Sequence, residues 1–173
     1  MVTLLLVSEL DIASTIQGDA LLARGGWVEK AKVEGGRVWK HENKDVWLWW
    51  FGEGFLMEDR LDERFSSAIE HSVDEVIFLS RHYAASGRPS LTLHVLGVPG
   101  EYPHGERAEH GGIKGKVMLP NPRFASWYRL MCDAAHRHQL VPEFELTIET
   151  THHGPCLEVP TMFIEIGSSE THW

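Results

Sequence analysis

The chain has 173 residues, of which 43% are hydrophobic and 24% charged, and its formal net charge is −9. This length and composition predict one globular domain with a buried core. The sequence contains no run of about 18 apolar residues, which excludes a membrane-spanning helix of ordinary length. Residues 2–7 are largely apolar, but no basic region precedes them and acidic residues follow. This pattern predicts a first buried strand, not a signal peptide, and a cytoplasmic protein.

The acidic total argues against a nucleic-acid partner, but the charges are unevenly distributed. Residues 80–140 contain eight basic and four acidic side chains, a sum of +4. The rest of the chain contains eight basic and 21 acidic side chains, a sum of −13. An acidic protein can still offer one basic face to phosphate groups. A solvated loop and helix surface would explain the same charges.

The first half of the chain alternates between strand and helix patterns. Residues 2–8 predict a strand, and Asp11 predicts the cap of a helix with apolar positions up to residue 22. Residues 27–33 and 37–42 flank the turn Glu34-Gly35-Gly36 and predict a hairpin, followed by a strand at 46–52. Acidic residues at 58–63 suit the first turn of a further helix, and residues 76–79 predict a short strand.

In the second half, residues 91–97 predict a strand, and about twenty residues with little pattern follow, a length typical of a functional loop. Asn121 and Pro122 predict the start of a helix that continues to about Gln139. Residues 144–150 and 161–167 predict two closing strands. Together these elements predict a three-layer α/β fold with a mixed, largely parallel central sheet.

Polar residues gather near the ends of four predicted strands. Open α/β sheets place their ligands at the carboxyl ends of strands, so we expect these residues to share a cleft. They are Ser80, Arg81 and His82; His94 and Gly97; His152 and His153; and Glu165 and Gly167.

Alternation along the strands singles out Glu165. It shares a strand face with Phe163, and Thr92 shares one with His94. A carboxylate in a strand that is apolar on both faces costs several kcal/mol unless it is paired or binds a metal. Glu165 is therefore the strongest candidate for a functional role, although a structural salt bridge or an exposed strand end would also explain it.

The segment THHGP places two histidines before Gly154 and Pro155. Neighbouring residues of an extended strand point to opposite faces, so at most one histidine should meet Glu165 unless the chain turns at Gly154. Imidazole suits zinc ligation, acid–base catalysis or substrate binding, and packing alone would also explain it.

The segment GSSE offers two interpretations. Gly167, Ser168 and Ser169 could form a helix N-terminus whose N–H groups hold a phosphate or an oxyanion. They could equally form a capped turn with no ligand.

Three segments resemble the archaeal and plant type of D-aminoacyl-tRNA deacylase: SRHYAASGRPSLTLHVLG (residues 80–97), THHGP (151–155) and VPTMFIEIGSSETHW (159–173). The resemblance covers nearly the whole chain, with weaker agreement elsewhere. Val98 and Cys156 depart from the family, which usually has Asn and Thr there. Family members continue past EIGSSE, so we expect residues 1–173 to form a single α/β domain without the family's C-terminal extension.

The resemblance implies hydrolysis of the ester between a D-amino acid and the 3′ end of tRNA, with zinc as cofactor and tRNA as partner. It also implies a fold like those of phosphorylases and peptidyl-tRNA hydrolases. Two alternatives stay open: another metal-dependent hydrolase of a small amide or ester, and a non-catalytic relative that binds tRNA or a partner subunit.

On this hypothesis, roles can be assigned to particular residues. The expected catalytic residues are His82, His94, His152, His153 and Glu165, and the expected metal ligands are His152, His153 and Glu165. Substrate contacts are expected from Ser80, Arg81, Thr92, Gly154, Gly167, Ser168 and Ser169. The basic segment 107–137 could receive the acceptor stem.

Overall fold

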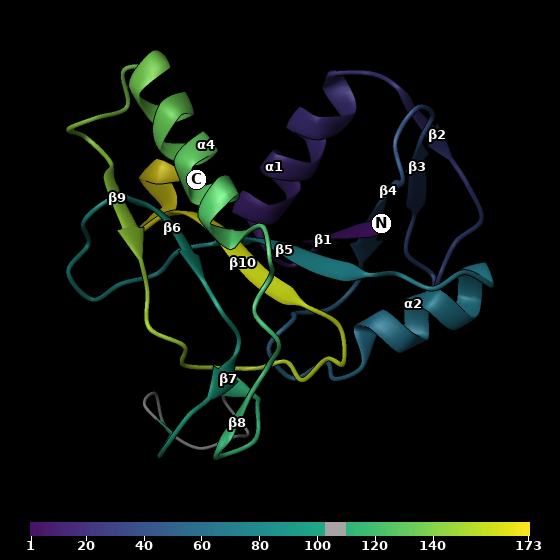
Figure 1. Ribbon diagram of the computed structural model, residues 1–173. Helices are drawn as coiled ribbons and strands as arrows, with labels where there is room; N and C mark the ends of the chain where they lie inside the picture. The colour runs from purple at the N-terminus through teal and green to yellow at the C-terminus, as the bar shows by residue number, and fades with distance from the viewer. Residues whose placement is uncertain (103–109) are drawn as a thin grey trace.

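The computed structural model describes residues 1–102 and 110–173 (Figure 1). Its main feature is an eight-stranded sheet in the order β2-β3-β4-β1-β5-β10-β6-β9, beside which β7 and β8 pair separately. The strands are β1 (Thr3–Ser8), β2 (Trp27–Glu29), β3 (Val38–His41), β4 (Val46–Phe51), β5 (Glu75–Arg81), β6 (Ser90–His94), β7 (Gly97–Val98), β8 (Lys116–Val117), β9 (Glu145–Ile148) and β10 (Thr161–Gly167). The helices are α1 (Ile12–Ala23), α2 (Leu61–Ile69), α4 (Phe124–Arg137) and the short 3-10 helix η1 (Glu170–His172).

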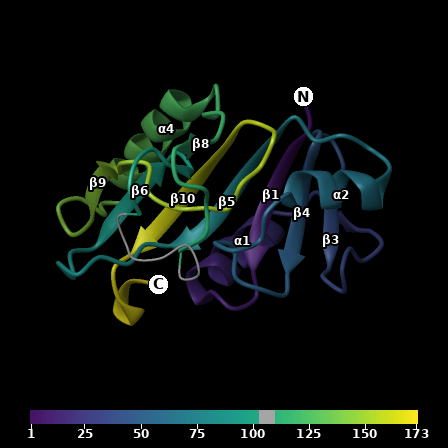
Figure 2. The same ribbon diagram turned by 90° about the horizontal axis from the view of Figure 1, so that it is seen from below.

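Helices cover both faces of the sheet, which confirms the three-layer α/β fold. Helices α1 and α4 lie on one face and α2 on the other (Figures 1 and 2). Strand β1 shows why its residues are apolar throughout. Leu4 and Leu6 point into the core on the α2 side, whereas Leu5 and Val7 point into the core on the side of α1 and α4.

The sheet is mixed, as predicted. Strands β4, β1, β5 and β10 are mutually parallel, and β2 and β3 form the predicted hairpin next to β4. However, β6 runs antiparallel to β10, and β9 is parallel to β6. The four polar groups therefore do not share one carboxyl edge. His94 ends β6 opposite Phe163, which lies in the interior of β10.

The predicted cap residues lie at the starts of two helices. Asp11 caps α1 as predicted, because its Oδ1 accepts the N–H groups of Ala13 (3.0 Å) and Ser14 (3.2 Å). Helix α4 begins at Phe124, later than predicted. Asn121 nevertheless accepts the Arg123 N–H on its Oδ1 at 2.8 Å, as a cap residue does, and its buried amide also donates to Glu75 at 2.8 Å, a contact that the local pattern does not reveal. No helix in the described part of the chain combines the length and apolarity needed to cross a membrane.

Three backbone segments meet closely at Gly154. Its N–H donates to the His110 carbonyl at 3.0 Å, and a Cβ on Gly154 would lie 2.6 Å from the Leu56 carbonyl oxygen and 2.9 Å from the carbonyl carbon of Gly111. These neighbours are backbone atoms, which cannot move aside as a flexible side chain can. The glycine of THHGP therefore allows this loop to lie against two others.

Gly154→Ala should lower the free energy of unfolding by about 1–3 kcal/mol, because overpacking forces the backbone to shift. Gly52→Ala is the matched control, since a Cβ there would meet no atom within 4 Å. Urea unfolding of both variants would measure the difference. Equal stability of the two variants would contradict the close packing at Gly154.

Candidate active site

A cavity of about 640 Å³ lies on the α2 side of the sheet. Its walls come from the carboxyl ends of β1 and β5, from residues 53–58 between β4 and α2, from the loop after β9, and from β10. The ionisable residues of its described lining are Asp11, Glu53, Glu58, Arg81, His82, Tyr83, His110, Glu149, His152, His153 and Glu165. The cavity thus collects side chains from segments that are far apart in the sequence.

Glu165 is buried in the wall of this cavity between two histidines. Nδ1 of His82 lies 3.4 Å from its Oε2, and Nε2 of His94 lies 3.4 Å from its Oε1. Burial alone would raise the pKa of Glu165, but the two histidines outweigh it and lower the pKa to about 2. Glu165 is therefore an ionised, buried carboxylate.

His82 is held between two carboxylates, since its Nδ1 also lies 2.9 Å from Oε1 of Glu149. Burial would lower the pKa of His82, but Glu149 and Glu165 outweigh it and raise the pKa to about 9. Burial would likewise raise the pKa of Glu149, and contact with His82 lowers it instead. This cluster therefore keeps His82 as an imidazolium at neutral pH.

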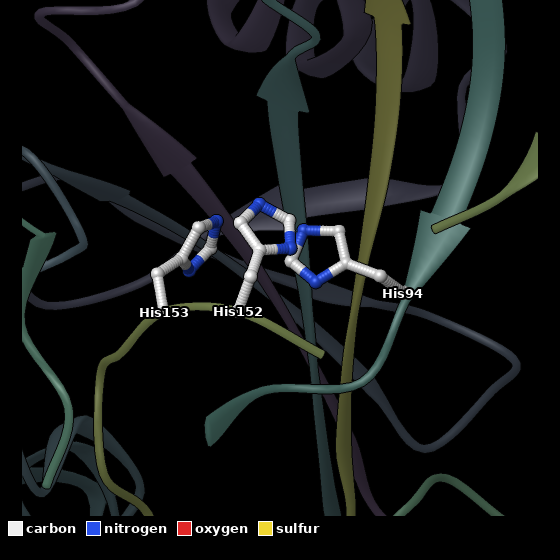
Figure 3. Close-up of side chains that lie close together, drawn as sticks. All are labelled: His94, His152 and His153. Atoms are coloured by element: carbon white, nitrogen blue, oxygen red, sulfur yellow. The ribbon is translucent and has the colours of Figure 1, made fainter. Parts of the chain in front are cut away.

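Three imidazole rings come together beside this cluster (Figure 3). The ring centroids of His94, His152 and His153 lie 4.4 to 4.7 Å apart. Strand β9 ends at Ile148, so strand alternation does not govern the two histidines beyond it. The loop instead returns beside the segment after β6, where Gly97 donates its N–H to the His153 carbonyl at 2.7 Å. Both histidines therefore reach His94.

Hydrogen bonds to the backbone orient these three rings. Nδ1 of His94 lies 3.1 Å from the Val95 carbonyl, Nδ1 of His152 2.6 Å from the Thr150 carbonyl, and Nδ1 of His153 2.6 Å from the Gly154 carbonyl. A carbonyl oxygen only accepts, so each Nδ1 carries the proton and donates it. In a neutral ring the lone pair is then on Nε2, the arrangement found in metal-binding histidines.

The pKa values of His94 and His153 shift in opposite directions. Burial would lower the pKa of His94, but Glu165 raises it. Burial, reinforced by repulsion from His94 and His152, lowers the pKa of His153 to about 3. His153 is therefore neutral at physiological pH and offers a lone pair on Nε2, whereas the proton on Nε2 of His94 is stabilised by Glu165.

Two side-chain groups in the described part of the chain have the composition and spacing to hold a metal ion. One contains His94, His152 and His153, and the other His82, Glu149 and Glu165. Within each group the potential ligand atoms lie within 4.8 Å of one another. The three backbone-oriented imidazoles suit a divalent transition metal, because their Nδ1 partners fix the tautomer that a metal requires.

Asp11 and Glu149 are site residues that sequence reasoning missed. Besides capping α1, Asp11 uses Oδ2 to accept the Arg81 N–H at 2.8 Å and the Ser80 hydroxyl at 3.1 Å. The helix-cap signal concealed this second role. Glu149 directly follows β9, precedes the histidine pair and lines the cavity. A carboxylate at the end of a predicted strand was the feature of the sequence that could have identified it.

The expected site residues fall into three groups by position. Lining the cavity are Ser80, Arg81, His82, His152, His153 and Glu165. Fully buried on β6 are Thr92, opposite Glu165 in register, and His94. Outside the lining are Gly154, Gly167, Ser168 and Ser169; the Ser168 hydroxyl donates to the Arg88 carbonyl, and Ser169 contacts His172 just before η1.

The basic segment 107–137 does not form one surface beside the cavity. Arg107, at its start, lies outside the described residues. Helix α4 packs through Trp127 and Met131 on the core that it shares with α1, on the sheet face opposite the cavity. Its arginines therefore do not border the cavity.

Asp11→Asn should lower kcat/KM at this site about tenfold, because the amide keeps a capping oxygen but presents N–H to the Arg81 N–H. The unpaired N–H should also lower the free energy of unfolding by about 1–3 kcal/mol. Steady-state kinetics and urea unfolding would measure both effects. Asp19→Asn, on the exposed side of α1, is the control. If the Asp11→Asn variant had the kinetics of the wild type, the contacts of Asp11 with Ser80 and Arg81 would not be needed to position the site.

Fold and site together define an α/β protein with a cavity lined by histidines and carboxylates. A futalosine hydrolase mutant of Helicobacter pylori shares the fold, with a TM-score of 0.52 at 10% identity over 98% of this chain and 88% of the other. A solved structure described as a conserved protein of unknown function is much more similar. Its TM-score is 0.83 at 31% identity over 99% of this chain and 57% of that one.

The family model of D-aminoacyl-tRNA deacylase matches residues 69–173. A D-aminoacyl-tRNA deacylase of Arabidopsis thaliana is 44% identical over the whole of this chain and 54% of its own length. One from Archaeoglobus fulgidus is 32% identical over 98% of this chain and 57% of its own length. The chain therefore belongs to the D-aminoacyl-tRNA deacylase family, as the sequence resemblance predicted. It spans somewhat more than half the length of these relatives.

Proposed function

We propose that this chain carries the site for hydrolysis of the ester in D-aminoacyl-tRNA, yielding the free D-amino acid and tRNA. The observation that carries the proposal is the enclosed Glu165 carboxylate between His82 and His94, next to the histidine pair of THHGP. A relative that bears the name of this activity matches the chain at 44% identity over its full length.

Zinc is the proposed cofactor, held by His152 and His153 together with His94 and Glu165. The donor set supports this choice, because three Nδ1–H groups are engaged by backbone carbonyls, which makes Nε2 the ligand atom of each ring. Zinc binding would require His94 to release the Nε2 proton that Glu165 stabilises. Bound zinc would supply a water molecule with its pKa lowered to about 7 and would polarise the ester carbonyl. His153, with a pKa of about 3, is a weak base, and its neutral ring is better suited to ligation.

The remaining proposed roles follow from position. His82 lies between Glu149 and Glu165, so its ring keeps a positive charge near the reacting carbonyl and can donate a proton to the departing ribose oxygen. Ser80 and Arg81 border the cavity and are proposed substrate contacts. The protein would meet this substrate in the cytoplasm, with tRNA as its partner.

Incubation with D-tyrosyl-tRNA and L-tyrosyl-tRNA tests the proposal. The D-ester should disappear at least tenfold faster than in buffer, while the L-ester should remain as stable as in buffer. Parallel reactions with a chelator and with added zinc would test the cofactor. Loss of the D-ester at the buffer rate, with and without zinc, would contradict the proposal.

A further inference from the structure

We propose that Arg81 and Tyr83 form a seat for the 3′-terminal nucleotide of the substrate, with Tyr83 stacking on the base and Arg81 binding its phosphate. This inference rests on the proposed function and extends it from the ester to the nucleic acid that carries the ester. It names Tyr83, which the sequence analysis did not single out.

The exposure pattern at the end of β5 supports this seat. His82 is buried and belongs to the carboxylate cluster, whereas its neighbours Arg81 and Tyr83 are exposed, and all three line the cavity. Tyr83 is 77% exposed, an unusual position for an aromatic ring beside an enclosed polar site. Alternate residues of an extended chain lie about 6.6 Å apart, within the span of one nucleotide.

Arg81 is held in place from two sides. Its backbone N–H donates to Asp11, and its guanidinium carbon lies 5.3 Å from the centroid of the Trp173 ring. Stacking on an aromatic face leaves the N–H edges of a guanidinium available, and these edges match a phosphate group. An arginine ordered in this way loses less conformational entropy when it binds an anion.

The charges around the cavity determine where a phosphate can approach. The described lining carries five carboxylates, namely Asp11, Glu53, Glu58, Glu149 and Glu165, and Arg81 is its only lysine or arginine. The imidazolium of His82 is already paired with Glu149 and Glu165, so a phosphate is attracted mainly by Arg81 and repelled near Glu53 and Glu58. The same carboxylates attract the ammonium group of the amino acid. The amino acid would therefore lie inside the cavity and the terminal phosphate at Arg81.

Stacking explains why an exposed tyrosine would serve here. The 3′ end of tRNA is single-stranded, and proteins bind unpaired bases by stacking them on aromatic rings and guanidinium planes. Tyr83 provides the ring and Arg81 the charge at the mouth of the cavity, next to the cluster of Glu165. The base of the terminal nucleotide would lie on Tyr83 outside the cavity, and the ester would lie inside it.

Equilibrium binding of an uncharged RNA minihelix with a single-stranded CCA end tests the seat without requiring hydrolysis. Tyr83→Ala should weaken binding at least fivefold, whereas Tyr83→Phe should stay within twofold because it keeps the ring. Arg81→Ala should also weaken binding at least fivefold and reduce the slope of log K against log salt by about 0.7. Arg129→Ala, on the exposed side of α4, is the matched control and should stay within twofold.

Kinetics with D-aminoacyl-tRNA provide the second readout. Tyr83→Ala should raise KM at least fivefold with kcat within twofold, since the ring contacts the substrate away from the ester. Wild-type Kd and KM in both alanine variants would overturn the seat. Weakened minihelix binding without any ester hydrolysis by the wild-type chain would support the seat and contradict the proposed function, so the two failures are distinguishable.

Discussion

Glu165→Gln should lower kcat/KM for D-aminoacyl-tRNA by about 10³-fold, the range expected when an essential charged group of an active site is removed. The amide keeps the shape of the side chain but loses the negative charge that faces His82 and His94. His94 would then lose the partner that raises its pKa, and the proposed metal would lose an anionic ligand. Single-turnover kinetics with excess enzyme would measure the chemical step directly.

The control for this variant is Glu145→Gln. Glu145 lies on β9 and is exposed, where it pairs with Arg88 at 3.1 Å on the surface. Surface pairs of this kind contribute little to stability, so its kinetics and melting temperature should match the wild type. A folded Glu165→Gln protein with activity within threefold of wild type would remove Glu165 from the proposed mechanism.

His153→Ala should weaken zinc binding by at least about 100-fold, because it removes a neutral imidazole whose Nε2 lone pair is kept available by the bond from Nδ1 to the Gly154 carbonyl. Competition with a chromophoric chelator would give the affinity. Metal analysis of the dialysed protein would give the stoichiometry. Neither measurement depends on the activity of the loaded protein.

His136→Ala is the matched control for metal binding. His136 lies on the exposed side of α4, on the sheet face opposite the cavity, so its loss should leave the zinc affinity unchanged. A His153→Ala protein that retains wild-type zinc affinity would show that the histidine cluster is not the metal site.

Local pattern was sufficient to predict most of the architecture. The continuous apolar run of β1, the cap at Asp11 and the hairpin of β2 and β3 all depend on neighbours in sequence. Asn121 makes the predicted cap contact with the Arg123 N–H, but its amide also binds Glu75, a residue 46 positions away. No local signal reports such a partner.

The direction of β6 was also beyond the reach of local pattern. Alternation of residues along a strand is the same whether the strand pairs in a parallel or an antiparallel direction. The prediction that His94 lies at a shared carboxyl edge was therefore wrong, because β6 is antiparallel to β10. The expectation that Glu165 would need polar partners rested on the cost of burying a charge, which holds for any topology. This is why the need of Glu165 for polar partners could be predicted from the sequence, whereas the arrangement of those partners could not.

The position of β10 has a consequence for synthesis of the protein. It is the last of the described strands in sequence, yet it pairs between β5 and β6 in the interior of the sheet. Until it inserts, β5 and β6 expose unpaired edges, and the Glu165 carboxylate is missing from between His82 and His94. A nascent chain on the ribosome therefore cannot assemble this cavity until residue 167 has emerged, and its open strand edges must be protected from mispairing until then.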